Sequence, residues 1–208
     1  MAGLELFVFA EFVLVALLVP GIGLFHRRVI AKVAAPLLVP LTITPALLIY
    51  VRTVAPGLTL VEGLRLQLLA CCFGIGLAGL AALAGRRWPW GGPLAVTLLG
   101  LLALASPFWG DILLNLSHAG LRAAALKVLV AVNPLFIAAR ELHFDWTRGT
   151  VIYQHQLTRL GEHFAYRPPV LLVAALSYAL VGLLAASLAG LLRQKGRPSE
   201  YLIDTAHF

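Results

Sequence analysis

The sequence "LQLLACCFGIGLAGLAALAG", residues 66–85, has no charged side chain over twenty consecutive positions. An α-helix needs about 20 predominantly apolar residues to cross the hydrocarbon core of a bilayer, so this stretch alone is long enough to span a membrane. Similar runs recur along the chain, and the sequence predicts an all-α integral membrane protein, a single polytopic domain with five transmembrane helices. The expected spans are residues 4–25, 34–51, 66–85, 93–108 and 169–192.

The composition of the whole chain agrees with this prediction. Hydrophobic residues make up 61% of the 208 residues and charged residues 12%, whereas an average soluble domain is about 25% charged. The formal net charge is +7, but the basic residues are scattered at the ends of the apolar runs. That distribution favours contact with a lipid bilayer over nucleic-acid binding. Cys71 and Cys72 are adjacent inside a run, which predicts small core residues, and no cofactor is expected.

A sixth apolar run, residues 119–139, is interrupted by Arg122 and Lys127. A basic residue at the centre of a span costs roughly 2.5 to 3.5 kcal/mol on the insertion scale. We therefore expect this run to lie in the interface or to re-enter the membrane, as part of an external interfacial segment at residues 109–168. A six-span chain is the alternative.

The basic residues also predict how the chain is threaded. They cluster after the first, third and last spans, at residues 27–32, 86–87 and 193–197. Short segments rich in Lys and Arg stay in the cytoplasm. Five spans place all three clusters on that side, so we expect a multi-pass protein of the cell membrane with the N-terminus outside and the C-terminus in the cytoplasm.

Three of the runs carry residues that affect the helix backbone or its packing. Pro36, Pro40 and Pro45 fall within ten positions of the second expected span, and each internal proline removes a helical hydrogen bond. They indicate either a hinge that lines a pathway or an ordinary kink. The glycines of the third span, with alanines and glycines of the last span, form small-residue faces on which another helix can pack closely. Such faces stabilise either a bundle or an oligomer.

Glu5 and Glu11 are acidic residues inside an apolar run. Ionisable residues within a membrane are costly and are functional candidates for that reason. Glu5 lies near the end of its span, whereas Glu11 lies deeper. Glu11 could pair with Lys127 or Arg122, accept a proton or contact a transported group, and pairing is the first expectation.

The polar residues of the external segment allow a second kind of site. His155, Glu162 and His163 carry groups that bind metals or transfer protons, but their spacing differs from that of the zinc-protease motif. A membrane enzyme acting on a lipid headgroup through these residues is the third-ranked hypothesis. A solvated cap that faces the headgroups, without metal or catalytic chemistry, is favoured.

From residue 107 onward, the order of features resembles the C-terminal part of the membrane subunits of type-two ABC exporters. The features are Asn133, Pro134 and Leu135, then Arg140, the last span and the basic tail "RQKGR" at residues 193–197. The resemblance implies re-entrant helices on the external side before the last span. It also implies a second copy or another membrane subunit, and a separate cytoplasmic ATPase that contacts the loop "FHRRVIAKV" at residues 25–33.

Two functional hypotheses follow. In the first, the chain is a non-catalytic membrane component of an export system, with the ATPase on another subunit. In the second, it is a structural or assembly subunit of a larger membrane complex. The first hypothesis predicts an ATP-binding partner, and the second predicts stable partners without transport.

Overall fold

The computed structural model describes residues 2–22, 31, 34, 37–53, 59–143 and 168–195. In these ranges the regular structure is helical, without a strand. Helices α1 (Ala2–Ile22), α4 (Leu60–Arg87) and α11 (Leu171–Lys195) each contain a segment long and apolar enough to cross a membrane. Two bent helix pairs raise the number of candidate spans to as many as five. The all-helical class is confirmed, with three to five candidate spans, and the count of five stays a prediction.

The first bent pair begins with α5 (Gly91–Leu104), which turns by 60° into the short α6 (Ser106–Trp109) and the 3-10 helix η3 (Gly110–Asn115). In the second, α7 (Ala119–Val132) turns by 71° into α8 (Pro134–Glu141). Residues 119–139, expected to be interfacial or re-entrant, thus form a broken helix. A bend of this size is typical of either a re-entrant element or a broken span.

Helix α3 (Leu38–Thr53) occupies most of the second expected span. Its 16 residues extend about 24 Å at 1.5 Å per residue, which is less than the roughly 30 Å of a bilayer core. Pro40 lies in its first turn, and the helix continues through Pro45, whose side chain is exposed. The expected hinge in this segment is therefore not a break in the described part of α3.

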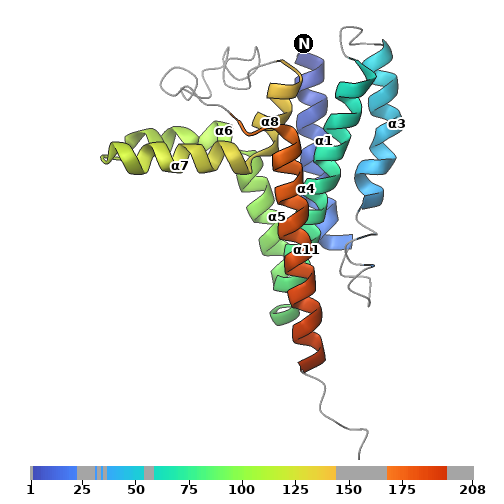
Figure 1. Cartoon of the computed structure of the whole chain (residues 1–208), viewed down its shortest axis with the longest axis vertical. Coiled ribbons are helices and arrows are strands. Elements are labelled where there is room, and N and C mark those ends of the chain that lie inside the picture. Colours follow the sequence, from blue (N-terminus) through green and yellow to red (C-terminus); the bar gives the residue numbers. More distant parts are fainter. Residues whose placement is uncertain are drawn as a thin grey trace, which may run out of the picture.

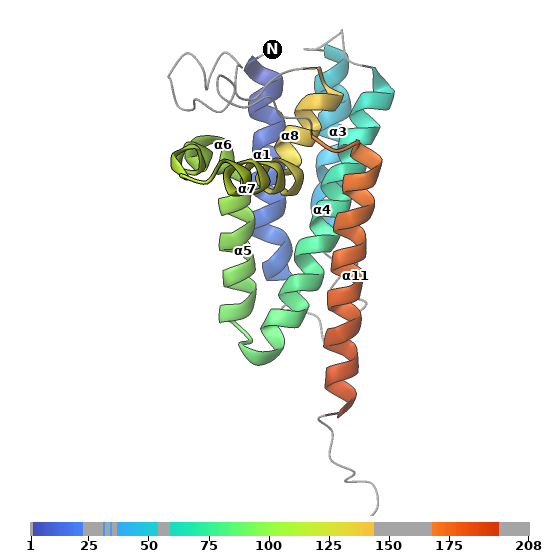
Figure 2. The same ribbon diagram turned by 60° about the vertical axis from the view of Figure 1, so that its left-hand side comes forward.

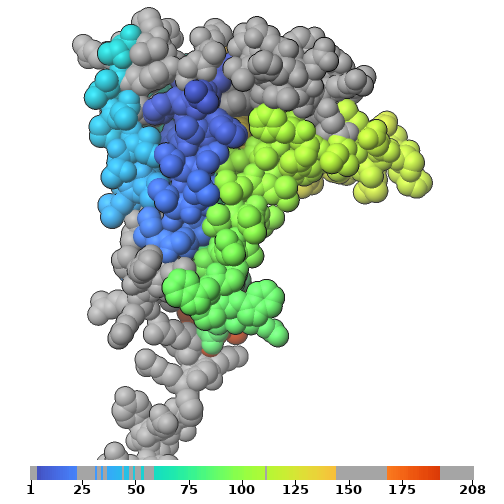
Figure 3. All heavy atoms as spheres, turned by 180° about the vertical axis from the view of Figure 1, so that it is seen from behind, coloured from blue at the N-terminus to red at the C-terminus, as the bar shows by residue number. Residues whose placement is uncertain are grey.

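The long helices stand side by side, and α4 is at their centre. Helices α1, α4 and α11 run in one direction and α3 and α5 in the other (Figures 1 and 2). Helix α4 contacts α1, α3, α5, α8 and α11. The segment α6, η3 and α7 extends sideways from this bundle as an arm, which we call the transverse arm (Figure 1). Seen from behind, the arm projects away from α5 (Figure 3).

Both ends of α4 are fixed by polar contacts. At its start, the Thr59 hydroxyl accepts a hydrogen bond from the Glu62 amide, and the Glu62 carboxylate accepts one from the Thr59 amide. This reciprocal pair satisfies amides that have no partner within the helix. At its end, Arg86 donates to the carbonyls of Ala189, at 3.0 Å, and Leu192. The last turns of α4 and α11 are therefore joined.

The outer surface is apolar. Leucine side chains of α5 and α11 point outward and are half or more exposed, among them Leu94, Leu98, Leu176, Leu180 and Leu191. In water such a continuous surface would be a strong aggregation hazard. Outward leucines on long apolar helices are typical of a membrane protein.

Candidate functional site

The break between α7 and α8 is centred on Asn133, whose side chain is completely buried. Its Oδ1 accepts a hydrogen bond from the Leu135 amide at 2.8 Å, and its Nδ2 donates to Ser106 Oγ at 2.8 Å. Asn is a preferred residue before the first turn of a helix, and Pro134 occupies the first helical position, where its missing N–H is no loss. Asn133 therefore starts α8 and joins it to α6.

A second contact holds the same break from the other side. The Tyr178 hydroxyl of α11 donates to the Val132 carbonyl in the last turn of α7, at 3.0 Å. Terminal carbonyls of a helix have no partner within it, so this hydroxyl satisfies one of them. We call Val132, Asn133, Ser106 and Tyr178 the Asn133 elbow. It joins the transverse arm to the start of α8 through Ser106 and to α11 through Val132.

Helix α8 is buried within the bundle. Residues 134–139 are all buried, and the helix contacts α1, α4, α7 and α11. Arg140, at its end, is exposed and donates to the Pro168 carbonyl just before α11. The segment after the elbow thus inserts between the long helices before the chain returns in α11.

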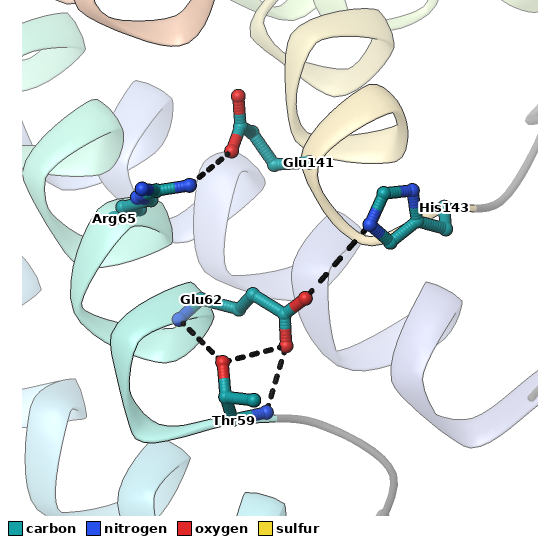
Figure 4. Close-up of polar contacts among 5 residues, drawn as sticks. All are labelled: Thr59, Glu62, Arg65, Glu141 and His143. Carbon is teal, nitrogen blue, oxygen red and sulfur yellow. Dashed lines mark hydrogen bonds and ion pairs between the residues drawn. The ribbon is translucent and has the colours of Figure 1, made fainter.

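The end of α8 meets the start of α4 through two exposed basic side chains and two partly buried carboxylates (Figure 4). Arg65 Nη1 lies 3.4 Å from Glu141 Oε2, and His143 Nε2 lies 3.9 Å from Glu62 Oε1. His143 has a φ of 56°, in the left-handed region, where it follows the last turn of α8. The Arg65 side chain is 57% exposed, and ion pairs of this kind contribute about 0 to 1 kcal/mol. These contacts orient α8 more than they stabilise it.

Glu11 lies at the centre of the bundle. Its residue is 1% exposed, and both carboxylate oxygens lack a hydrogen-bond partner among the described residues. Gln67 of α4 is its polar neighbour. The Gln67 amide nitrogen donates to the Pro40 carbonyl of α3, while its oxygen is also buried without a partner in the described ranges. The three helices α1, α3 and α4 therefore share one small polar cluster, Glu11, Gln67 and the Pro40 carbonyl.

The expected pairing of Glu11 with a basic residue is not observed. Lys127 is exposed on α7, and Arg122 donates to the Leu114 carbonyl at 3.3 Å. Both belong to the transverse arm, which points away from the bundle (Figure 1). The pairing was expected because a buried acid favours a basic partner, but the sequence does not reveal that α7 lies crosswise.

Other candidate residues lie outside the described ranges. They are Pro36, His155, Glu162 and His163, and with them almost all of the loop at residues 25–33. Among the described residues, no group of three or more His, Cys, Asp or Glu side chains could hold a metal ion.

Three residues that take part in the Glu11 cluster and the Asn133 elbow were not identified from the sequence: Gln67, Ser106 and Tyr178. Gln67 is a polar side chain within a long apolar run, and this isolation was an available signal. Ser106 and Tyr178 gave no comparable signal, because hydroxyls are common in membrane helices and only the tertiary contact gives these two a partner.

Comparisons with known proteins leave the family open. No protein-family model, no curated protein and no solved structure matches the chain.

Proposed function

We propose that this chain is a non-catalytic, permease-like membrane component of an export system, in which a separate cytoplasmic subunit hydrolyses ATP. The observation that carries the proposal is the Asn133 elbow. A crosswise helix, a break at Asn133-Pro134 and a short helix inserted into the bundle precede the last long helix. This is the order of elements that the resemblance to type-two ABC exporters implies.

The proposal includes five membrane passes, by α1, α3, α4, α5 and α11. The transverse arm and α8 then form an external re-entrant element. Arg86 and Arg87 lie at the end where α4 meets the last turns of α11. Because basic residues stay on the cytoplasmic side, this end faces the cytoplasm, and the end formed by Thr59 and Glu141 faces outward.

The packing also bears on the second hypothesis, a structural or assembly subunit. Gly79 and Gly182 pack against each other within one chain, so their small-residue faces are occupied. The transverse arm instead exposes apolar side chains, including Ile112, Leu121 and Val128. A partner subunit that covered this arm would favour the assembly hypothesis.

Purification in a mild detergent, followed by mass spectrometry of the bound subunits, separates the two hypotheses. Recovery of an ATP-binding subunit supports the export proposal. Recovery of membrane or extrinsic subunits without one contradicts it and favours an assembly role.

Where an ATPase is recovered, the complex is reconstituted in lipid and its ATP hydrolysis measured with Asn133→Ala and, as a matched control, Asn115→Ala. Both substitutions remove an amide, but Asn115 is exposed at the end of η3. We expect Asn133→Ala to change the hydrolysis rate several-fold and Asn115→Ala to leave it unchanged. Equal rates for both variants would show that the elbow is not coupled to the ATPase.

A further inference from the structure

Glu11 is placed where a carboxyl group is costly. It is the tenth of the 21 residues of α1, halfway along a helix that contacts α3, α4, α5 and α8. Its residue is 1% exposed. Removing a bare carboxylate from water costs several kcal/mol unless a cation or several hydrogen-bond donors replace the water. The groups around Glu11 therefore decide its ionisation state.

The neighbourhood has acceptors and hardly any donors. Three buried oxygens lack a partner among the described residues: both carboxylate oxygens of Glu11, and Oε1 of Gln67. The neighbouring amide donor, Gln67 Nε2, is directed to the Pro40 carbonyl. A carboxylate is an acceptor only, whereas a protonated carboxyl is also a donor. A proton on one Glu11 carboxyl oxygen turns that oxygen into a donor, and Gln67 Oε1 is then an acceptor to which it can bond.

The charged groups on the surrounding helices do not neutralise Glu11. On α4 the nearby ionisable group is the Cys71 thiol, and α5 has no ionisable residue. On α8, Arg140 is directed to the Pro168 carbonyl and Glu141 to Arg65.

The remaining charges on the packed helices are bound elsewhere or remote along the helix axes. On α4, Glu62 accepts from the Thr59 amide, and Arg86 and Arg87 lie in the last turn, nineteen residues or more beyond Gln67, which is about 28 Å of helix. Arg52 of α3 is twelve residues from Pro40, or about 18 Å of helix, and Glu5 is six residues from Glu11 on α1, or about 9 Å. No cation in the described part of the chain therefore replaces the proton.

We propose that Glu11 and Gln67 form a proton-binding site in the interior of the bundle, in which the protonated Glu11 carboxyl donates to Gln67 Oε1. Gln67 positions the proton and at the same time ties α4 to α3 through the Pro40 carbonyl. Loss of the proton leaves a buried charge without a counterion, so it requires water to reach the interface of α1, α3 and α4. Opening of this interface and release of the proton are thus coupled. This site does not depend on the export proposal, because it is built by this chain alone.

Carbodiimide labelling of the full chain in lipid vesicles tests the site. Dicyclohexylcarbodiimide is an apolar reagent that adds as a whole to a protonated carboxyl, so the modified residue gains the mass of the reagent and nothing leaves. Peptide mass spectrometry locates the modified residue. We expect Glu11 to be labelled at neutral pH, with labelling lost as the pH is raised, and the Glu11→Gln variant to be unlabelled at this position.

Infrared difference spectra report the protonation state of Glu11 directly, without requiring the carbodiimide to reach this buried residue. Wild type minus Glu11→Gln should show the carbonyl band of one protonated carboxylic acid at neutral pH. Gln67→Leu should shift this band to higher frequency, because the acid loses its hydrogen-bond acceptor. If the Glu11→Gln variant fails to fold, Glu11→Asp replaces it in the difference spectrum. This variant keeps a carboxyl group but shifts the carbonyl band of the acid.

The labelling and the infrared spectra together distinguish a proton site from a bare carboxylate and from a cation site. Labelling of Glu11 together with the acid band, both unaffected by replacing choline with sodium or potassium, supports a proton site. Carboxylate bands at neutral pH overturn the proposal, whether or not labelling occurs. Loss of the acid band when sodium or potassium is added also overturns it, and assigns the three oxygens to a monovalent cation.

Discussion

Gly79 of α4 and Gly182 of α11 pack backbone against backbone. A Cβ atom at Gly79 would overlap the Gly182 carbonyl, and a Cβ at Gly182 would overlap the carbonyl of Ile75. Close approach of this kind is what small residues permit in membrane helices, where lipid supplies no hydrophobic drive for helices to associate. The longest two helices of the bundle are held together at this crossing, and α8 packs against both of them.

Gly182→Ala should therefore separate α4 from α11. Forcing a methyl group into a close-packed contact costs typically 1 to 3 kcal/mol, and here the neighbour is backbone, which cannot rotate away. Thermal unfolding in detergent, followed by tryptophan fluorescence, should show a clearly lower midpoint. Gly190→Ala is the matched control on the same helix, because a Cβ there meets nothing within 4 Å. Its midpoint should be unchanged or higher, since Ala favours a helix by about 1 kcal/mol over Gly. Equal losses in both variants would contradict the close crossing.

The Asn133–Ser106 hydrogen bond should be a measurable source of stability. Both residues are buried, and a buried polar group left without its partner costs about 1 to 3 kcal/mol. We expect Asn133→Ala to lower the free energy of unfolding more than Ser106→Ala, because Asn133 also accepts from the Leu135 amide. The double variant should lose less than the sum of the two. Additive losses would indicate that the two side chains do not interact.

Gln67→Leu should loosen α3 selectively. The Gln67 amide is a side-chain donor from α4 to the backbone of α3, and leucine of similar size removes the donor while filling the space. Hydrogen–deuterium exchange, measured by mass spectrometry in detergent, should become faster in α3 than in wild type. Peptides from α11 provide an internal control and should exchange at the wild-type rate. Unchanged exchange in α3 would show that this contact does not hold the helix in place.

The proposed orientation can be read by labelling single cysteines in intact cells. In a Cys71→Ala, Cys72→Ala background, Trp90→Cys lies in the turn between α4 and α5, and Leu60→Cys lies at the start of α4; both native side chains are exposed. We expect a maleimide that cannot cross membranes to label Leu60→Cys from outside. Trp90→Cys should react only after permeabilisation. The reverse pattern would invert the topology, and labelling of both from one side would rule out a pass by α4.

Sequence by itself determined the class of this protein. Long apolar runs give helices around residues 66–85 and 169–192, because a chain in lipid must satisfy its backbone hydrogen bonds internally. The start of α8 is also encoded locally, because Asn is favoured just before the first turn of a helix and Pro at its first position. The apolar run did not determine where α4 begins. The run starts at residue 66, but the helix starts at Leu60, because Thr59 and Glu62 form a cap before its first turn.

Tertiary structure decided which residues meet. The period of apolar residues does not reveal that α7 lies crosswise, so the expected partner of Glu11, Lys127, points away while Gln67 takes its place. Similarly, small-residue faces are compatible with a bundle or an oligomer, and only the crossing of α4 and α11 shows that Gly79 and Gly182 face each other within one chain. Contacts of this kind depend on helix direction and crossing angle, which are set by the packing of all the helices together and not by any one segment.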